Sequence, residues 1–209
     1  IATPELLNEW IFEKGKADVK FTARSNGGHA SAPSKGTPIA RLSAFVNEVE
    51  THSPFRKKLL PEVSAMFTEL APYAGFGMKL VFGNVWLFGP VLKAVMPAIS
   101  AQAGAMLKTT IAFTVQKGSD AYNVLPQEAY VGANMRFIPH QGEKESLEII
   151  KKVAGKYGLE TEVLHANDYT PPVDIHGEAF HLVEQTIADT FPGLPSSPYV
   201  MTGATDAQF

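Results

Sequence analysis

The chain of 209 residues contains no cysteine. Disulfide bonds and thiolate catalysis are therefore excluded, and because this composition suits a reducing compartment we expect a cytoplasmic protein. An excess of positive charge is missing too, since 18 Lys and Arg stand against 21 Asp and Glu, for a formal net charge of -3. Proteins that bind nucleic acid carry a basic face, so no nucleic-acid partner is expected.

The sequence also lacks a long uninterrupted apolar run. Residues 80–107 carry a single charge, Lys93, but glycine, proline and asparagine interrupt the segment repeatedly. A membrane-spanning helix needs about 20 consecutive apolar residues, so we expect no membrane partner. Buried helices of an insertion or an apolar docking surface are favoured, and a membrane-attached protein is the weaker alternative. The chain starts at Ile1 and stops at Phe209 without a helix cap or a tail, so we expect a fragment of a longer protein.

Hydrophobic periodicity predicts a series of regular elements. Residues 4–12 have a helical apolar stripe, which Gly15 would terminate. Thr37 and Pro38 are typical of a helix start, and the stripe formed by Ile39, Leu42, Phe45, Val46 and Val49 predicts a helix over 38–51. Further along, we expect strands at 18–24, 109–117, 129–137, 159–164 and 198–201, and helices at 144–157 and 177–191, the last with Phe180, Val183 and Ile187 inward.

The order of these elements predicts an α+β fold. Strand, helix, strand, strand, helix, strand is the βαββαβ order of a ferredoxin-like sandwich, here with a helical insertion at about 53–107. We expect this sandwich domain to occupy residues 17–167. Residues 1–16 would form a flanking helix and linker, and residues 168–209 part of a second domain beyond a proline-rich hinge at 169–172.

A histidine lies on the turn between the first predicted strand of this sandwich and the helix that follows. The segment is Gly27-Gly28-His29-Ala30-Ser31-Ala32-Pro33. Loops held by a rigid scaffold are common places for binding and catalytic groups. A turn histidine without a function is the alternative, and for His29 considered alone that alternative is favoured.

Four segments together resemble a known family. They are residues 27–33, Asn123-Val124-Leu125-Pro126, Asn134-Met135-Arg136 and Gly203-Ala204-Thr205-Asp206. In this order and spacing they resemble the lid, or dimerisation, domain of the zinc aminoacylase/carboxypeptidase family, which includes glutamate carboxypeptidase, succinyl-diaminopimelate desuccinylase and aminoacylase. The inserted helices and residues 116–119 look most like the carboxypeptidase S and N-fatty-acyl amino acid hydrolase branch.

The resemblance implies roles for individual residues. His29 would stabilise the oxyanion of the tetrahedral intermediate in the partner subunit, with Asn123 beside it at the substrate. Arg136 would hold the substrate carboxylate, for which its planar set of donors is suited. The backbone amides of Gly203, Ala204 and Thr205 would approach the substrate. Without the resemblance, an Asx-type turn at Asn123, a surface charge at Arg136 and a tight turn at 203–205 are the alternatives.

The resemblance also implies two zinc ions in the intact parent. The family's first ligand pair is His-x-Asp, and none of the six histidines begins such a triplet. We therefore expect no metal site in this chain. The nearest alternative is His176 and Glu178 together with His181, a loose ligand spacing that is commoner at the surface of a helix start.

The resemblance thus implies the lid part of a metal-dependent hydrolase that cleaves an amide bond adjacent to a free carboxylate, at a peptide C-terminus or in an N-acyl amino acid. The chain alone would be inactive and would form a homodimer through edge strands or the first helix of the sandwich. A non-catalytic dimerisation or binding module is the alternative.

Overall fold

The computed structural model describes residues 7–194 and 196–203. The strands are β1 (Leu7–Glu13), β2 (Gly15–Arg24), β3 (Gly28–His29), β4 (Thr110–Lys117), β5 (Val124–Leu125), β6 (Glu128–Phe137), β7 (Glu160–Asn167) and β8 (Ser196–Met201). The helices are α1 (Pro38–Thr51), α2 (Pro61–Leu70), α3 (Phe76–Phe82), α4 (Val85–Ile99), α5 (Ala101–Ala105), α6 (Glu143–Lys156) and α7 (Glu178–Thr190), with a short 3-10 turn at Ala71–Tyr73.

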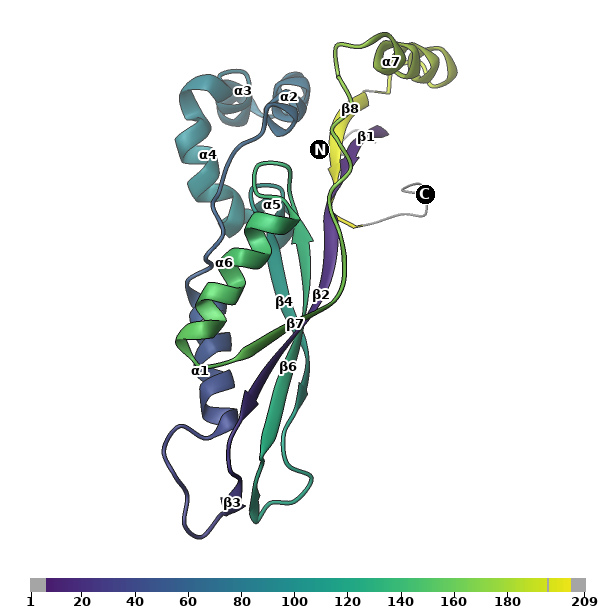
Figure 1. Ribbon diagram of the computed structural model, residues 1–209. Helices are drawn as coiled ribbons and strands as arrows, with labels where there is room; N and C mark the ends of the chain where they lie inside the picture. The colour runs from purple at the N-terminus through teal and green to yellow at the C-terminus, as the bar shows by residue number, and fades with distance from the viewer. Residues whose placement is uncertain (1–6, 195, 204–209) are drawn as a thin grey trace.

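The main sheet has four strands in the order β4-β6-β2-β7, and every neighbouring pair is antiparallel. Helices α1 and α6 cover one face of this sheet (Figure 1). This is the strand order of the ferredoxin-like sandwich, so the α+β expectation is confirmed. The opposite face of the sheet is not covered by any helix in the described part of the chain.

Alternation along the central strands builds the sandwich core. On β6, Ala129, Val131, Ala133 and Met135 are buried, while the residues between them are more exposed. Phe21 of β2 packs on Phe45 of α1 with ring centroids 4.8 Å apart. Burial of a phenylalanine side chain contributes about 1.5–3 kcal/mol, so these inward rows determine which face α1 and α6 cover.

Helix α1 begins where the sequence predicts, because the Thr37 side chain accepts a hydrogen bond from the Ala40 amide. One expected inward residue is wrong. Ile39 is 40% exposed, because it lies against the backbone of Gly118 at the end of β4 and not against the core. The same expectation is wrong for Val183 on α7, which is exposed whereas Phe180 is buried.

The helix expected at residues 4–12 is wrong over its described part. Residues 7–13 form β1, which pairs in parallel with β8 from the far end of the chain. Ile11 and Phe12 are both buried in one core cluster, at the point where the pairing register of β1 with β8 shifts between Trp10 and Phe12. Gly15 then starts β2 and does not cap a helix. A Cβ there would lie 2.6 Å from the backbone of Asp168, where the returning chain crosses.

Helices α2 to α5 form the predicted insertion and build a second core on the β1–β8 pair. Its buried residues include Ile11, Phe12, Leu60, Val63, Met66, Phe67, Leu92, Met96, Leu107 and Val200. The expectation of buried helices holds for the inner side of α4 and is wrong for its outer side, because no described element packs there. Among the described residues no single helix has the length and hydropathy to cross a bilayer, while α3 and α4, bent by 108°, satisfy those criteria only as a pair.

Candidate functional site

His29 and Asn123 lie together at one end of the sheet. The two-residue strand β3 pairs with β5, so that His29 stands opposite Val124, and the Ala30 amide donates to the Asn123 carbonyl over 3.0 Å. Gly27 has φ of +70°, which other residues rarely adopt, and the chain turns there into β3. Both predicted residues are therefore presented on one exposed loop pair (Figure 1).

Local hydrogen bonds orient the His29 ring. The Ser31 amide donates to Nδ1 over 3.2 Å, and the Ser31 hydroxyl lies 2.7 Å from the same nitrogen. Because Nδ1 accepts the amide hydrogen, the proton of the neutral ring is on Nε2. Nε2 makes no hydrogen bond to any residue that the structure describes. His29 thus presents an unused N–H donor at the tip of the molecule.

A hollow of about 440 Å³ lies beside this tip, between the start of α1 and the connection from β4 to β5. It is lined by Thr37, Ile39 and residues 119–122 and 124–126. The hollow is open, and the two chain neighbours of Asn123, Tyr122 and Val124, line it.

Arg136 lies at the opposite end of β6, on the face of the sheet that no helix covers. Its Nε donates to Asn134 Oδ1 over 3.0 Å, and Asn134 Nδ2 donates to Asp18 Oδ1 over 2.7 Å. The Asn134 hydrogen bond is the main cause that lowers the pKa of Asp18, so this carboxylate stays charged. Nη1 of Arg136 is shielded from solvent and has no partner among the described residues. The guanidinium is held at one edge and retains donors for an anion.

A second cation, Lys14, lies near Arg136. Its side chain is fully buried, and Nζ donates to the carbonyls of Ala105 and Lys108 over 3.0 and 2.9 Å. Burial first, and then the charges of Arg136 and Lys108, lower the pKa of Lys14 from 10.5 to about 7. The sequence gives no indication of this residue, because a lysine is rarely buried so completely.

Gly203 follows the end of β8, at the Arg136 end of the molecule. Lys14 connects the end of β8 with Arg136. Its backbone amide donates to the Met201 carbonyl over 3.2 Å, and its side-chain charge interacts with that of Arg136. Ala204, Thr205 and Asp206 lie outside the described residues.

The two groups of candidate residues are therefore far apart within one chain. β6 runs from Glu128, next to the His29 loop, to Arg136, eight residues further on, which is about 27 Å of extended strand. The tip extends beyond the start of β6 at Glu128. The Ser25 amide still donates to the Gln127 carbonyl, and β3 begins only after this bond. One chain does not bring His29 and Arg136 into a common pocket.

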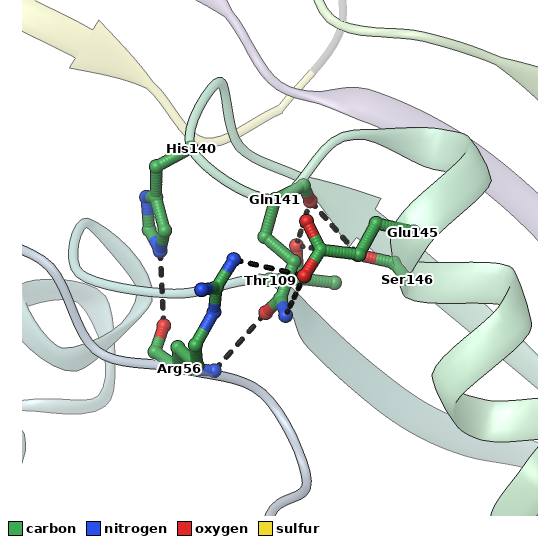
Figure 2. Close-up of polar contacts among 6 residues, drawn as sticks. All are labelled: Arg56, Thr109, His140, Gln141, Glu145 and Ser146. Atoms are coloured by element: carbon green, nitrogen blue, oxygen red, sulfur yellow. Dashed lines mark hydrogen bonds and ion pairs between the residues drawn. The ribbon is translucent and has the colours of Figure 1, made fainter.

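A polar cluster that the sequence did not indicate ties the insertion to the sandwich (Figure 2). The buried Gln141 accepts from the Arg56 amide over 3.0 Å through Oε1, and its carbonyl accepts from the hydroxyls of Thr109 and Ser146. The Arg56 guanidinium lies 2.8 Å from Glu145, and His140 Nε2 lies 3.0 Å from the Arg56 carbonyl. Arg56 and Thr109 lie on either side of helices α2 to α5, so the cluster fixes both ends of this helical segment on the turn before α6.

Within residues 7–194 and 196–203, no three His, Asp or Glu side chains are grouped as metal ligands. The alternative at 176–181 is not assembled there. His181 Nδ1 lies 3.0 Å from Glu184, and the His176 amide donates to Asp174.

Comparison with known proteins identifies relatives over nearly the whole chain. The N-fatty-acyl-amino acid synthase/hydrolase PM20D1 of Xenopus tropicalis is 30% identical over 204 residues, which cover 94% of this chain and 38% of that protein. A probable carboxypeptidase S-like 2 of Dictyostelium discoideum is 26% identical, with 95% of this chain and 38% of that protein covered. The chain thus spans less than half the length of these curated relatives.

Among solved structures, the M20 family metallo-carboxypeptidase Sso-CP2 of Sulfolobus solfataricus matches with a TM-score of 0.58 at 15% identity. The match covers 93% of this chain and 53% of that one, and at this identity it shows a shared fold. A family model described as the peptidase dimerisation domain matches residues 11–162, which is most of the chain. With four antiparallel strands under two helices and relatives of this kind, the chain belongs to the peptidase dimerisation domain family.

Proposed function

We propose that this chain is the lid and dimerisation part of a metal-dependent hydrolase that cleaves an amide bond adjacent to a free carboxylate. The substrate would be a peptide C-terminus or an N-acyl amino acid, in line with the names of the PM20D1 and carboxypeptidase S-like relatives. Residues 17–167 would form the lid, and the segments flanking it would connect to a catalytic domain.

The observation that carries this proposal is the separation of His29 from Arg136 along the sheet. His29 presents a free Nε2 donor at an exposed tip, and a donor of this kind stabilises developing negative charge on an acyl oxygen. Arg136 keeps unused guanidinium donors, an arrangement suited to a carboxylate. Each group serves one part of the proposed substrate, but they lie at opposite ends of β6.

A symmetric dimer resolves this separation. β4 is an edge strand, and α1 lies beside it, since Ser43, Asn47 and Gln116 line one hollow between them. A second copy can satisfy the unpaired backbone groups of this edge. If two β4 strands pair in antiparallel fashion about a two-fold axis, the tip of one protomer lies beside the Arg136 end of the other.

In this arrangement each active site would be completed by both protomers. Arg136 and the loop at Gly203 would serve the catalytic domain of their own chain, while His29 and Asn123 would reach the site of the partner. His29 would donate from Nε2 to the tetrahedral oxyanion, a contact worth about 3 kcal/mol in comparable sites.

We propose that the metal dependence of the intact protein involves two zinc ions held by residues outside this chain. The described residues do not form a cluster that fits a metal ion, so no step through a metal is assigned to them. That the chain alone retains no zinc after dialysis stays a prediction, which metal analysis tests.

Activity of the intact protein on matched substrates tests the proposal. An N-acyl amino acid should be hydrolysed, and the same compound with its carboxylate converted to an amide should react at least about 100-fold more slowly because Arg136 loses its partner. Equal rates on both compounds would argue against a carboxylate-directed hydrolase. Absence of hydrolysis of any acyl amino acid or peptide, with dimerisation retained, would instead support the non-catalytic dimerisation module.

A further inference from the structure

The outer side of α4 is apolar along its whole length. The exposed residues of this helix are Trp86, Leu87, Pro90, Val91, Ala94, Val95, Ala98 and Ile99. Their spacing places them in one stripe, about 22 Å long for a helix of 15 residues. The stripe is well exposed, with Trp86 at 81% and Ile99 at 65%. Contiguous apolar surface of this kind marks a contact site.

Helix α3, bent by 108° from α4, also exposes apolar side chains, since Phe76 is 90% exposed and Met78 and Leu80 are exposed too. We name these exposed apolar residues of α3 and α4 together the α3–α4 face. In Figure 1 both helices lie on the far side of α2 from the β1–β8 pair, and α2 contacts β8. The face is thus turned away from the strands through which the chain connects to its flanking segments.

Only one side of α4 is available for contact. Val85, Leu92 and Met96 on its inner side are buried in the insertion core. A partner must therefore meet the face from outside and accept a broad, shallow apolar surface. A planar partner fits this requirement, with the helices lying in the plane of the contact.

The charged side chains on α3 and α4 themselves are both lysines, whereas the neighbouring helix α2 carries Glu62 and Glu69. Residues 71–119 contain no Asp or Glu and four lysines, of which Lys79 lies on α3 and Lys93 on α4. Lys79 is exposed and Lys93 is partly buried beside the stripe. Pairing of the face with a second copy of itself would bring these cations together, whereas an anionic surface would be attracted to them. Trp86 and Phe76 are residue types that favour the boundary between headgroups and acyl chains.

We propose that the α3–α4 face docks on the surface of an anionic phospholipid bilayer. The apolar stripe enters the headgroup and acyl boundary, and Lys79 and Lys93 contact the lipid phosphates. This contact differs from the sequence-based expectation of no membrane partner. It is independent of the catalytic role proposed above, since none of its residues belongs to the His29 or Arg136 groups.

Sedimentation of the intact protein with vesicles tests the proposal. Vesicles of phosphatidylcholine and vesicles that also contain phosphatidylserine are compared at low and high salt. We expect stronger binding to the anionic vesicles, weakened by salt, and about tenfold weaker binding for Leu87→Glu, because one buried leucine is lost from the lipid contact.

Leu182→Glu is the matched control, since Leu182 is also a helical leucine, 64% exposed on α7 against 56% for Leu87. Both variants should keep the circular dichroism spectrum of the native protein, and the control should bind vesicles like the native protein. The fluorescence of Trp86, obtained as the difference from Trp86→Phe, should shift to shorter wavelength on vesicle binding.

Three results would overturn the proposal. One is the absence of vesicle binding, and another is equal binding by the Leu87 and Leu182 variants. The third is protection of Trp86 from acrylamide in the lipid-free intact protein, which would mean that the protein itself or a second copy covers the face.

Discussion

Nε of Arg136 donates a hydrogen bond to Oδ1 of Asn134, two residues earlier on the same strand, over 3.0 Å. This bond occupies one edge of the guanidinium and fixes its orientation above the open face of the sheet. Nη1 is left shielded from solvent and without a partner among the described residues. The pair therefore forms a preorganised donor site, and the first prediction follows from it.

Arg136→Ala in the intact protein should raise KM about 10- to 100-fold with a small effect on kcat, because a substrate carboxylate is bound alike in the ground and transition states. Steady-state kinetics on an N-acyl amino acid measures this. Lys20→Ala is a matched control, a cation on the same face that lies over Tyr130 in the middle of the sheet. A fall in kcat at unchanged KM would contradict the assigned role of Arg136.

His29→Ala should show the opposite pattern. Its Nε2 donor would act only on the charge that develops in the transition state, so kcat should fall by about 100- to 1,000-fold while KM changes little. The control is His52→Ala, an exposed histidine at the end of α1. If His29→Ala raised KM and left kcat unchanged, His29 would be a ground-state binding residue and the oxyanion role would be wrong.

Lys14 should make stability depend on pH. Its pKa is lowered to about 7 in the folded state and is near 10.5 in the unfolded chain. Between these values the unfolded chain holds the extra proton, so the free energy of unfolding contributed by this residue rises with pH. Below about pH 7 both states hold the proton, and the cost of burying the charge is present in full.

Urea unfolding at several pH values tests this by comparison with Lys14→Met. The stability of the native protein relative to this variant should increase from pH 7 towards pH 10. A difference that does not change with pH would mean that the burial of Lys14 does not shift its titration.

Gln141→Ala should destabilise the protein by about 1–3 kcal/mol, because the Arg56 amide loses its acceptor and a buried site is left unfilled. The same change at the exposed Gln185 of α7 should cost less than about 0.5 kcal/mol. Chemical denaturation measures both. Equal effects of the two changes would show that the cluster in Figure 2 does not hold the insertion to the sandwich.

The sequence predicts the elements that depend on local signals. Thr37 and Pro38 start α1 by capping and backbone preference, and alternation along β4 and β6 predicts strands that the sheet then uses. The local pattern of β1 predicts a helix, but its residues form a strand because they pair in parallel with β8, almost 190 residues away, and no local pattern reports such pairing.

The sequence proposes residues for the candidate site but does not predict their arrangement. The glycines around His29 indicate a turn, yet β3 and β5 are two residues long and too short for any periodicity. That His29 and Arg136 lie at opposite ends of the sheet follows only from the observed register. The burial of Lys14 could not be foreseen, because it depends on carbonyls from the end of the insertion.

The central claim is that each active site is shared between two protomers, and subunit mixing tests it most directly. Intact protein carrying His29→Ala is mixed with intact protein carrying Arg136→Ala under conditions that allow subunits to exchange. Each mixed dimer would contain one site with an intact Arg136 from its own chain and an intact His29 from the partner. Activity should therefore rise from the low level of either variant to about a quarter of the wild-type value. If both residues served the same site from one chain, the mixture would stay as inactive as the two variants alone, and the shared-site account would be wrong.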